Sequence, residues 1–86
     1  MNILVKGKVQ GVFFRAYTKQ KAEELGLRGF VKNNMDGSVY IETEGEENVL
    51  REFISWCRKG SPRSKVESVE STTSALVNFS SFKIEK

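Results

Sequence analysis

The sequence predicts an α+β fold in which two helices cover one face of an antiparallel sheet. Three observations indicate it. Short segments of alternating apolar and polar residues are typical of half-buried strands. Two longer segments carry apolar residues at helical spacing, and a glycine follows each of them. In chain order the segments form the βαββαβ pattern, with an extra short edge strand before the last one.

The first strand is predicted from Ile3 to Val9, because apolar and polar residues alternate there. A loop from Gln10 to Phe13 follows it. The first helix then begins at Phe14, because one apolar stripe continues along it, and Gly26 is a suitable stop after its last turn. The stripe consists of Phe14, Thr18, Ala22 and Leu25.

A hairpin is predicted next, with strands over residues 27–33 and 38–43 and a turn over residues 34–37. The second helix begins after Gly45 and ends at Gly60, with Pro62 beyond it. Its apolar stripe is the strongest in the chain and consists of Leu50, Phe53, Ile54 and Cys57. Residues 66–73 indicate a short edge strand, and residues 79–84 a last strand that completes the sheet.

The composition suits one small domain, residues 1–86, with 38% hydrophobic and 29% charged residues. The net charge of +3 is scattered along the chain and gives little support to nucleic-acid binding. The single cysteine excludes an internal disulfide, and the absence of histidine excludes Ser-His-Asp and Cys-His mechanisms and the usual zinc hydrolase sites. No signal peptide or membrane span is indicated, so we expect a cytoplasmic location.

The stretch from Gln10 to Arg15 predicts an anion site, because a strand, a tight loop and a helix start follow one another there. Gly11 accepts the positive φ that such a loop often needs, and Arg15 offers a planar fork of donors. The alternative is an ordinary surface loop with a solvated arginine. Because the first helix returns the chain, the first two strands run in the same direction. Arg15 and Asn33 are therefore expected at the same end of the sheet.

Asn33 offers both a donor and an acceptor, which suits the positioning of a water, although asparagine is also common beside hairpin turns. We expect the acidic residues at positions 23, 24, 42, 44, 46 and 47 to be solvated and Cys57 to be buried packing. Residues 28–31 match part of an RNA-recognition strand, but the second aromatic residue of that pattern is missing.

At these residues the sequence resembles the acylphosphatase family. The first family motif, an aliphatic residue followed by x-G-x-V-Q-G-V-x-F-R, is met in full from Val5 to Arg15. The second, G-aromatic-V-basic-N-x3-G-x-V-x5-G, is met from Gly29 to Gly45. The second helix and the loop at residues 60–62 also resemble the family, so the resemblance covers nearly the whole chain. Asn34 stands where the family often has threonine.

The resemblance implies a ferredoxin-like fold and an enzyme, an acylphosphatase, that hydrolyses acyl phosphates to a carboxylate and inorganic phosphate without metal or cofactor. It implies that Arg15 and backbone amides bind the phosphoryl group and that Asn33 orients the attacking water. The implied phosphate-binding residues are Gln10, Gly11, Val12, Phe13, Phe14 and Arg15.

We further expect a small-molecule acyl phosphate as substrate, inorganic phosphate as product and inhibitor, no nucleic-acid or membrane partner, and a monomer. A short open site suggests tolerance of many acyl groups. Two other functions stay open on the same fold. One is a binding module for RNA or a protein, and the other is a regulatory domain that holds phosphate without hydrolysing it.

Overall fold

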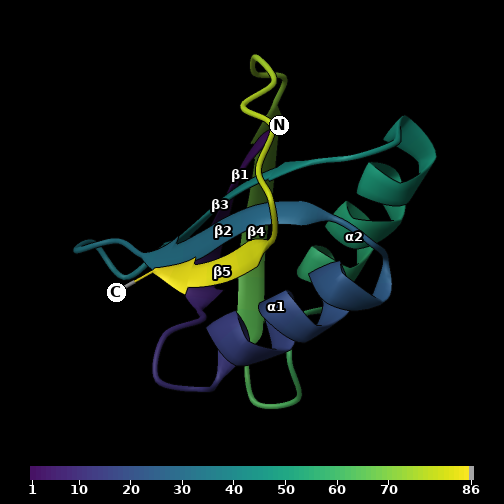
Figure 1. Cartoon of the computed structure of the whole chain (residues 1–86). Helices are drawn as coiled ribbons and strands as arrows, with labels where there is room; N and C mark the ends of the chain where they lie inside the picture. Colours follow the sequence, from purple (N-terminus) through teal and green to yellow (C-terminus); the bar gives the residue numbers. More distant parts are fainter. Residues whose placement is uncertain (86) are drawn as a thin grey trace.

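The computed structural model describes residues 1–85, and within them strands and helices follow one another in the predicted order (Figure 1). The boundaries agree with the sequence-based prediction to within three residues, and the start of α1 and the end of β2 coincide with it. The elements are β1 (Asn2–Lys8), α1 (Phe14–Glu24), β2 (Arg28–Asn33), β3 (Val39–Glu44), α2 (Glu47–Lys59), β4 (Lys65–Thr72) and β5 (Phe82–Glu85).

The strands form one sheet in the order β4-β1-β3-β2-β5. The predicted α+β, ferredoxin-like class is confirmed, but the sheet is mixed, because β5 runs parallel to β2 while the other neighbours are antiparallel. The extra short edge strand is also the last one rather than the one before it. The segment predicted to be short is β4, which has 8 residues and pairs with β1 along its length, whereas β5 has 4 residues.

One hydrophobic core lies between the sheet and the two helices, which cover the same side of it (Figure 1). The inward residues of α1 and α2 are those of the two predicted stripes, and Phe14, Thr18 and Cys57 are almost fully buried. The rings of Phe14 and Trp56 join the helices, with centroids 5.7 Å apart. Burial of each large apolar side chain contributes roughly 1.5–3 kcal/mol, so the helix stripes fix how both helices sit on the sheet.

The register places several strand ends side by side at one end of the sheet, which we call the loop end. Lys8 at the end of β1 pairs with Lys65 at the start of β4. Asn33 at the end of β2 pairs with Val39 at the start of β3, and Glu85 at the end of β5 pairs with Lys32. Because β1 and β2 are both antiparallel to β3, they run in the same direction, as predicted.

Glu44 is buried, and its expected place on a solvated strand face is wrong. The residue is only 7% exposed. Its two carboxylate oxygens accept hydrogen bonds from the backbone N–H groups of Asn78 at 3.2 Å and Phe79 at 3.0 Å. The segment between β4 and β5 therefore crosses the outer end of β3, and the Phe79 ring contacts that of Phe30.

Neither helix within residues 1–85 has the length and apolar content that a membrane crossing requires.

Candidate active site

The loop between β1 and α1 presents a series of unpaired backbone donors. Within residues 1–85, no backbone N–H group from Gly11 to Ala16 donates to a protein acceptor. The loop bends through Gly11 at φ 72° and Phe13 at φ 59°, and Phe13 is the N-cap residue of α1. No acidic side chain lies in the first turn of α1. Free N–H groups at a helix N-terminus favour an anion, so this loop suits one.

The side chain of Gln10 fixes the loop to the β2–β3 hairpin. Its Nε2 atom donates to the backbone oxygens of Asn34 and Ser38, both at 2.8 Å. The turn that receives these bonds is itself held together, because Asn34 Nδ2 donates to Ser38 Oγ at 2.9 Å. The pKa of Asp36 is lowered, because the Ser38 hydroxyl and backbone N–H both donate to its carboxylate. The loop and the strand end that carries Asn33 are therefore joined by direct hydrogen bonds.

Asn33 points to the face of the sheet that the helices cover. Directly opposed residues of antiparallel strands share a face, and Asn33 lies opposite Val39, which lies opposite Val5. Val39 and Val5 are both fully buried in the core. The Asn33 Oδ1 atom is buried and has no hydrogen-bond partner within residues 1–85. Because an unpaired buried acceptor is costly, this oxygen suits a bound water or ligand donor.

Arg15 lies in the first turn of α1 and reaches toward the far edge of the sheet. Its Nη1 atom donates to the backbone oxygen of Glu85 at 3.1 Å. Glu85 is the last residue of β5 and pairs with Lys32, the residue before Asn33. The structure thus brings Arg15, Asn33 and the loop to the loop end of the sheet, as the topology predicted. Arg15 is half-buried and keeps donor capacity for a second partner.

The remaining candidates lie away from the loop or are occupied. Cys57 is buried as predicted, and burial raises the pKa of its thiol to about 12, so it is not a nucleophile near neutral pH. The Phe30 ring contacts those of Tyr40 and Phe79, each with centroids 5.9 Å away, so it is not an open stacking platform. Among residues 1–85, no three His, Cys, Asp or Glu side chains gather as metal ligands.

Three contributions were not predicted from the sequence: the side-chain bonds of Gln10, the backbone acceptor of Glu85, and the exposed ring of Phe13. Gln10 and Glu85 act through partners that lie 24 and 70 residues away in the chain, so no local sequence pattern predicts these contacts. Phe13 could have been singled out from the sequence, because a large aromatic residue is unusual in a tight loop that contains glycine.

Comparison with known proteins agrees with this geometry. The family model for acylphosphatase matches residues 1–84. The chain is 44% identical to an acylphosphatase of Archaeoglobus fulgidus over 84 residues, covering 98% of this chain and 94% of that protein. It is 53% identical to an acylphosphatase of Rhizorhabdus wittichii over 68 residues, covering 79% of this chain and 69% of that protein.

A solved structure extends the likeness to three dimensions. The crystal structure of acylphosphatase from Bacillus subtilis superposes with a TM-score of 0.95 at 41% identity, covering 99% of this chain and 96% of that one. The match spans the anion loop, the hairpin with Asn33 and both edges of the sheet. The chain therefore belongs to the acylphosphatase family.

Proposed function

We propose that this acylphosphatase hydrolyses acyl phosphates with its loop amides and Arg15 around the phosphoryl group and with Asn33 beside the attacking water. The observation that supports this most is the oxygen of Asn33, which is buried and has no partner among residues 1–85, at the same end of the sheet as loop amides that are likewise unpaired there. An acceptor of this kind accepts a hydrogen bond from a water molecule and thereby aims a lone pair of that water at phosphorus.

The loop amides from Gln10 to Arg15 are proposed to bind the phosphoryl oxygens, whose charge the helix N-terminus favours. The Arg15 guanidinium is proposed to add two parallel N–H donors to the same group. A loose phosphoryl-transfer transition state spreads charge over these oxygens and asks mainly for positioning and charge stabilisation. A fixed set of donors meets both needs.

In the proposed step, the water oxygen forms a bond to phosphorus as the bond between phosphorus and the acyl oxygen breaks. The bonding electrons leave with the acyl oxygen as a carboxylate, and the proton of the water passes to an oxygen of the phosphate. The conjugate acid of the leaving group has a pKa of about 4, so the carboxylate departs without a general acid. The reaction therefore needs no histidine, which agrees with a chain that has none.

We further propose that residues 1–86 act as one cytoplasmic, monomeric domain and that inorganic phosphate inhibits by occupying the loop. The compact hydrogen bonding between loop and hairpin supports a site within one chain, because no second copy is needed to bring Arg15 and Asn33 together.

Phosphate release from acetyl phosphate by purified protein that has been treated with a chelator tests the proposal. We expect steady turnover that the chelator leaves unchanged and that inorganic phosphate inhibits competitively. A protein that binds phosphate without releasing it from acetyl phosphate would instead be a regulatory anion-binding domain. A protein with no turnover and with RNA affinity that falls steeply with salt would be a binding module.

A further inference from the structure

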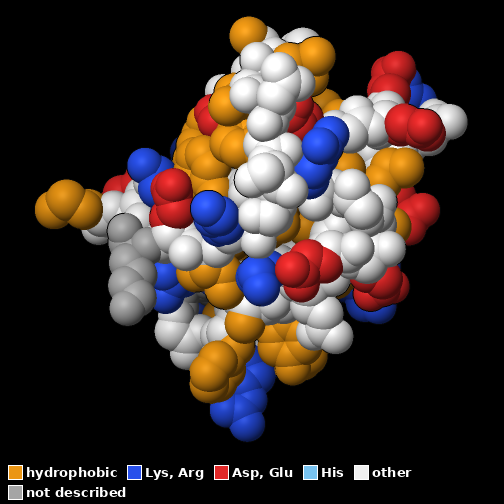
Figure 2. Space-filling view, viewed as in Figure 1, with side chains coloured by type: hydrophobic (Ala, Val, Ile, Leu, Met, Phe, Trp, Pro, Cys, Tyr) orange, Lys and Arg blue, Asp and Glu red, His pale blue; other side chains and the backbone are white. Residues whose placement is uncertain are grey.

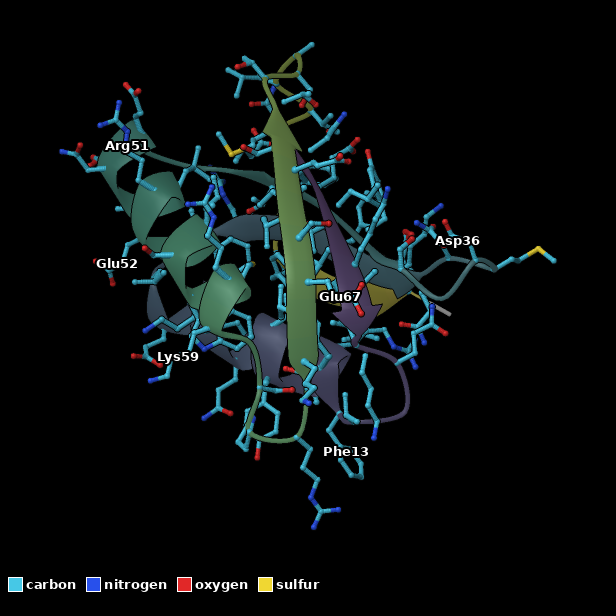
Figure 3. All side chains as sticks on the ribbon, turned by 180° about the vertical axis from the view of Figure 1, so that it is seen from behind. Phe13, Asp36, Arg51, Glu52, Lys59 and Glu67 are labelled. Carbon is cyan, nitrogen blue, oxygen red and sulfur yellow. The ribbon has the colours of Figure 1, made fainter. Side chains whose placement is uncertain are left out.

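Phe13 combines two costly features at the edge of the proposed phosphate site. Its backbone is left-handed, at φ 59°, which is uncommon for a bulky residue. Its side chain is also 73% exposed, although it is large and apolar. In Figure 3 the labelled Phe13 side chain projects outward from the loop. Both features have a purpose if the ring contacts a ligand that the loop holds.

A cavity of about 250 Å³ lies beside this ring. Its walls come from the anion loop, from α1 and from the loop that precedes β4. These segments are neighbours because the end of β1 pairs with the start of β4, and Figures 1 and 3 both show the two loops together at the lower end of the molecule. The lining residues are Val12, Phe13, Tyr17, Pro62 and Arg63.

A second cavity of about 460 Å³ continues past Tyr17 and Pro62, which line both. It adds Lys59 and the hydroxyl of Ser61, which is buried and has no hydrogen-bond partner within residues 1–85. Among the described residues that line the two cavities there is no Asp or Glu. Neither Arg63 nor Lys59 forms an ion pair within residues 1–85. Hydrophobic and basic side chains accordingly meet at the lower tip of the molecule in Figure 2.

The direction of the reaction points to the same place. In an in-line displacement, the attacking water and the leaving oxygen lie on opposite sides of phosphorus. Across the loop end of the sheet, Asn33 lies on β2 and the anion loop follows β1, while the Pro62–Arg63 loop adjoins β4 on the other side. A water beside Asn33 therefore directs the acyl group away from β2, toward the cavity of Phe13 and Tyr17.

We propose that this cavity is the acyl subsite and that it selects aromatic acyl phosphates carrying a second negative charge. The inference rests on the proposed function. Phe13 and Tyr17 provide aromatic surfaces for the ring of such a substrate, because offset and edge contacts between rings are favourable. Arg63, with Lys59 behind it, provides the positive charge for the distal anion, and Arg63 offers a fork that matches a carboxylate.

The test compares kcat/KM for acetyl phosphate, benzoyl phosphate and 4-carboxybenzoyl phosphate, with each aromatic value divided by that for acetyl phosphate in the same protein. This ratio cancels any general effect of a substitution on the phosphoryl site. The variants are Tyr17→Ala, Tyr17→Phe and the double variant Lys59→Ala/Arg63→Ala. Arg51→Ala is the matched control, because Arg51 lies at the opposite end of α2 from Lys59 (Figure 3).

We expect Tyr17→Ala to lower the benzoyl ratio about threefold to tenfold and Tyr17→Phe to restore it, because the ring contact is what matters. The double variant should lower the preference for 4-carboxybenzoyl over benzoyl phosphate about fivefold, while Arg51→Ala leaves it unchanged. Unmoved ratios in an enzyme that still hydrolyses acetyl phosphate would overturn the subsite alone. A wild-type protein that releases phosphate from none of the three substrates would overturn the proposed function and the subsite with it.

Discussion

The guanidinium of Arg15 donates a hydrogen bond to the backbone oxygen of Glu85, at 3.1 Å, and so links the first helix to the last strand. Glu85 pairs with Lys32, the residue before Asn33, so this bond holds the Arg15 guanidinium at the same end of the sheet as Asn33. The four-residue strand β5 thus has a positional role at the proposed site that its length would not suggest. It gives the arginine a fixed partner before any anion arrives, and fixed donors lose less freedom on binding.

Arg15→Lys should lower kcat/KM for acetyl phosphate on the order of a hundredfold, because a single ammonium cannot replace two parallel donors in the transition state. Arg28→Lys is the matched control, since Arg28 is exposed at the opposite end of β2. Steady-state kinetics of both variants decide the point. Near-wild-type turnover in Arg15→Lys removes this arginine from the mechanism.

Gln10→Ala should lower both stability and activity, because the backbone oxygens of Asn34 and Ser38 each lose one of their donors and the loop loses its link to the hairpin that carries Asn33. We expect the free energy of unfolding in urea to fall by about 2 kcal/mol. Gln20→Ala changes an exposed glutamine in α1 and should have little effect. Equal stabilities of the two variants would show that the loop and hairpin hold their positions without this side chain.

Glu44→Ala should destabilise the protein by about 2–3 kcal/mol, since it leaves the N–H groups of Asn78 and Phe79 without a charged acceptor. Glu52→Ala, at an exposed position of α2, should change stability by less than about 0.5 kcal/mol. Urea unfolding measures both, and faster hydrogen exchange at Asn78 and Phe79 in Glu44→Ala would locate the effect. Similar values for the two variants would show that the bonds from Asn78 and Phe79 to Glu44 do not stabilise the fold.

Stability should fall at alkaline pH because burial raises the pKa of Cys57 from its ordinary value of 9.0 to about 12. Below pH 9 the thiol is neutral in the folded and in the unfolded state. Between pH 9 and 12 the thiol ionises only in the unfolded state, which favours unfolding. Between pH 8 and 10, ionisation of this thiol in the unfolded chain should lower the free energy of unfolding by about 1.4 kcal/mol. The free energy of unfolding of Cys57→Ala, measured at both pH values, should fall by that much less than that of the wild-type protein. Parallel pH profiles of the two proteins would refute this assignment.

Much of the fold could be predicted from the sequence, because helix stripes and strand alternation are local patterns. Phe53 and Cys57 lie on the buried side of α2, as their spacing indicated, and Gly60 follows its end. The placement of Arg15 and Asn33 at the same end of the sheet followed from topology alone. The burial of Glu44 could not be foreseen, because its position in the strand alternation assigns it to the outer face. Its burial depends on a segment more than 30 residues away that crosses that face.

The pairing of β5 with β2 could likewise not be predicted from the residues of β5 alone. Its four residues carry no mark that distinguishes the two edges of the sheet, and the choice depends on where the preceding segment leaves β4. Within the candidate site, the types of residue could be predicted, but the side-chain hydrogen bonds that hold them in place could not. Gln10 was expected to contribute a backbone amide, whereas its side chain joins two other parts of the chain. Long-range side-chain bonds of this kind leave no periodic signal.

Asn33→Ala, with Asn48→Ala at an exposed position of α2 as its matched control, tests the central claim most directly. The measurement pairs kcat for acetyl phosphate with the inhibition constant of inorganic phosphate for each protein. The account predicts that kcat falls on the order of a hundredfold in Asn33→Ala while phosphate still inhibits within about threefold of its original constant. Loss of phosphate binding with kcat preserved would contradict it, because Asn33 would then hold the phosphate instead of the water.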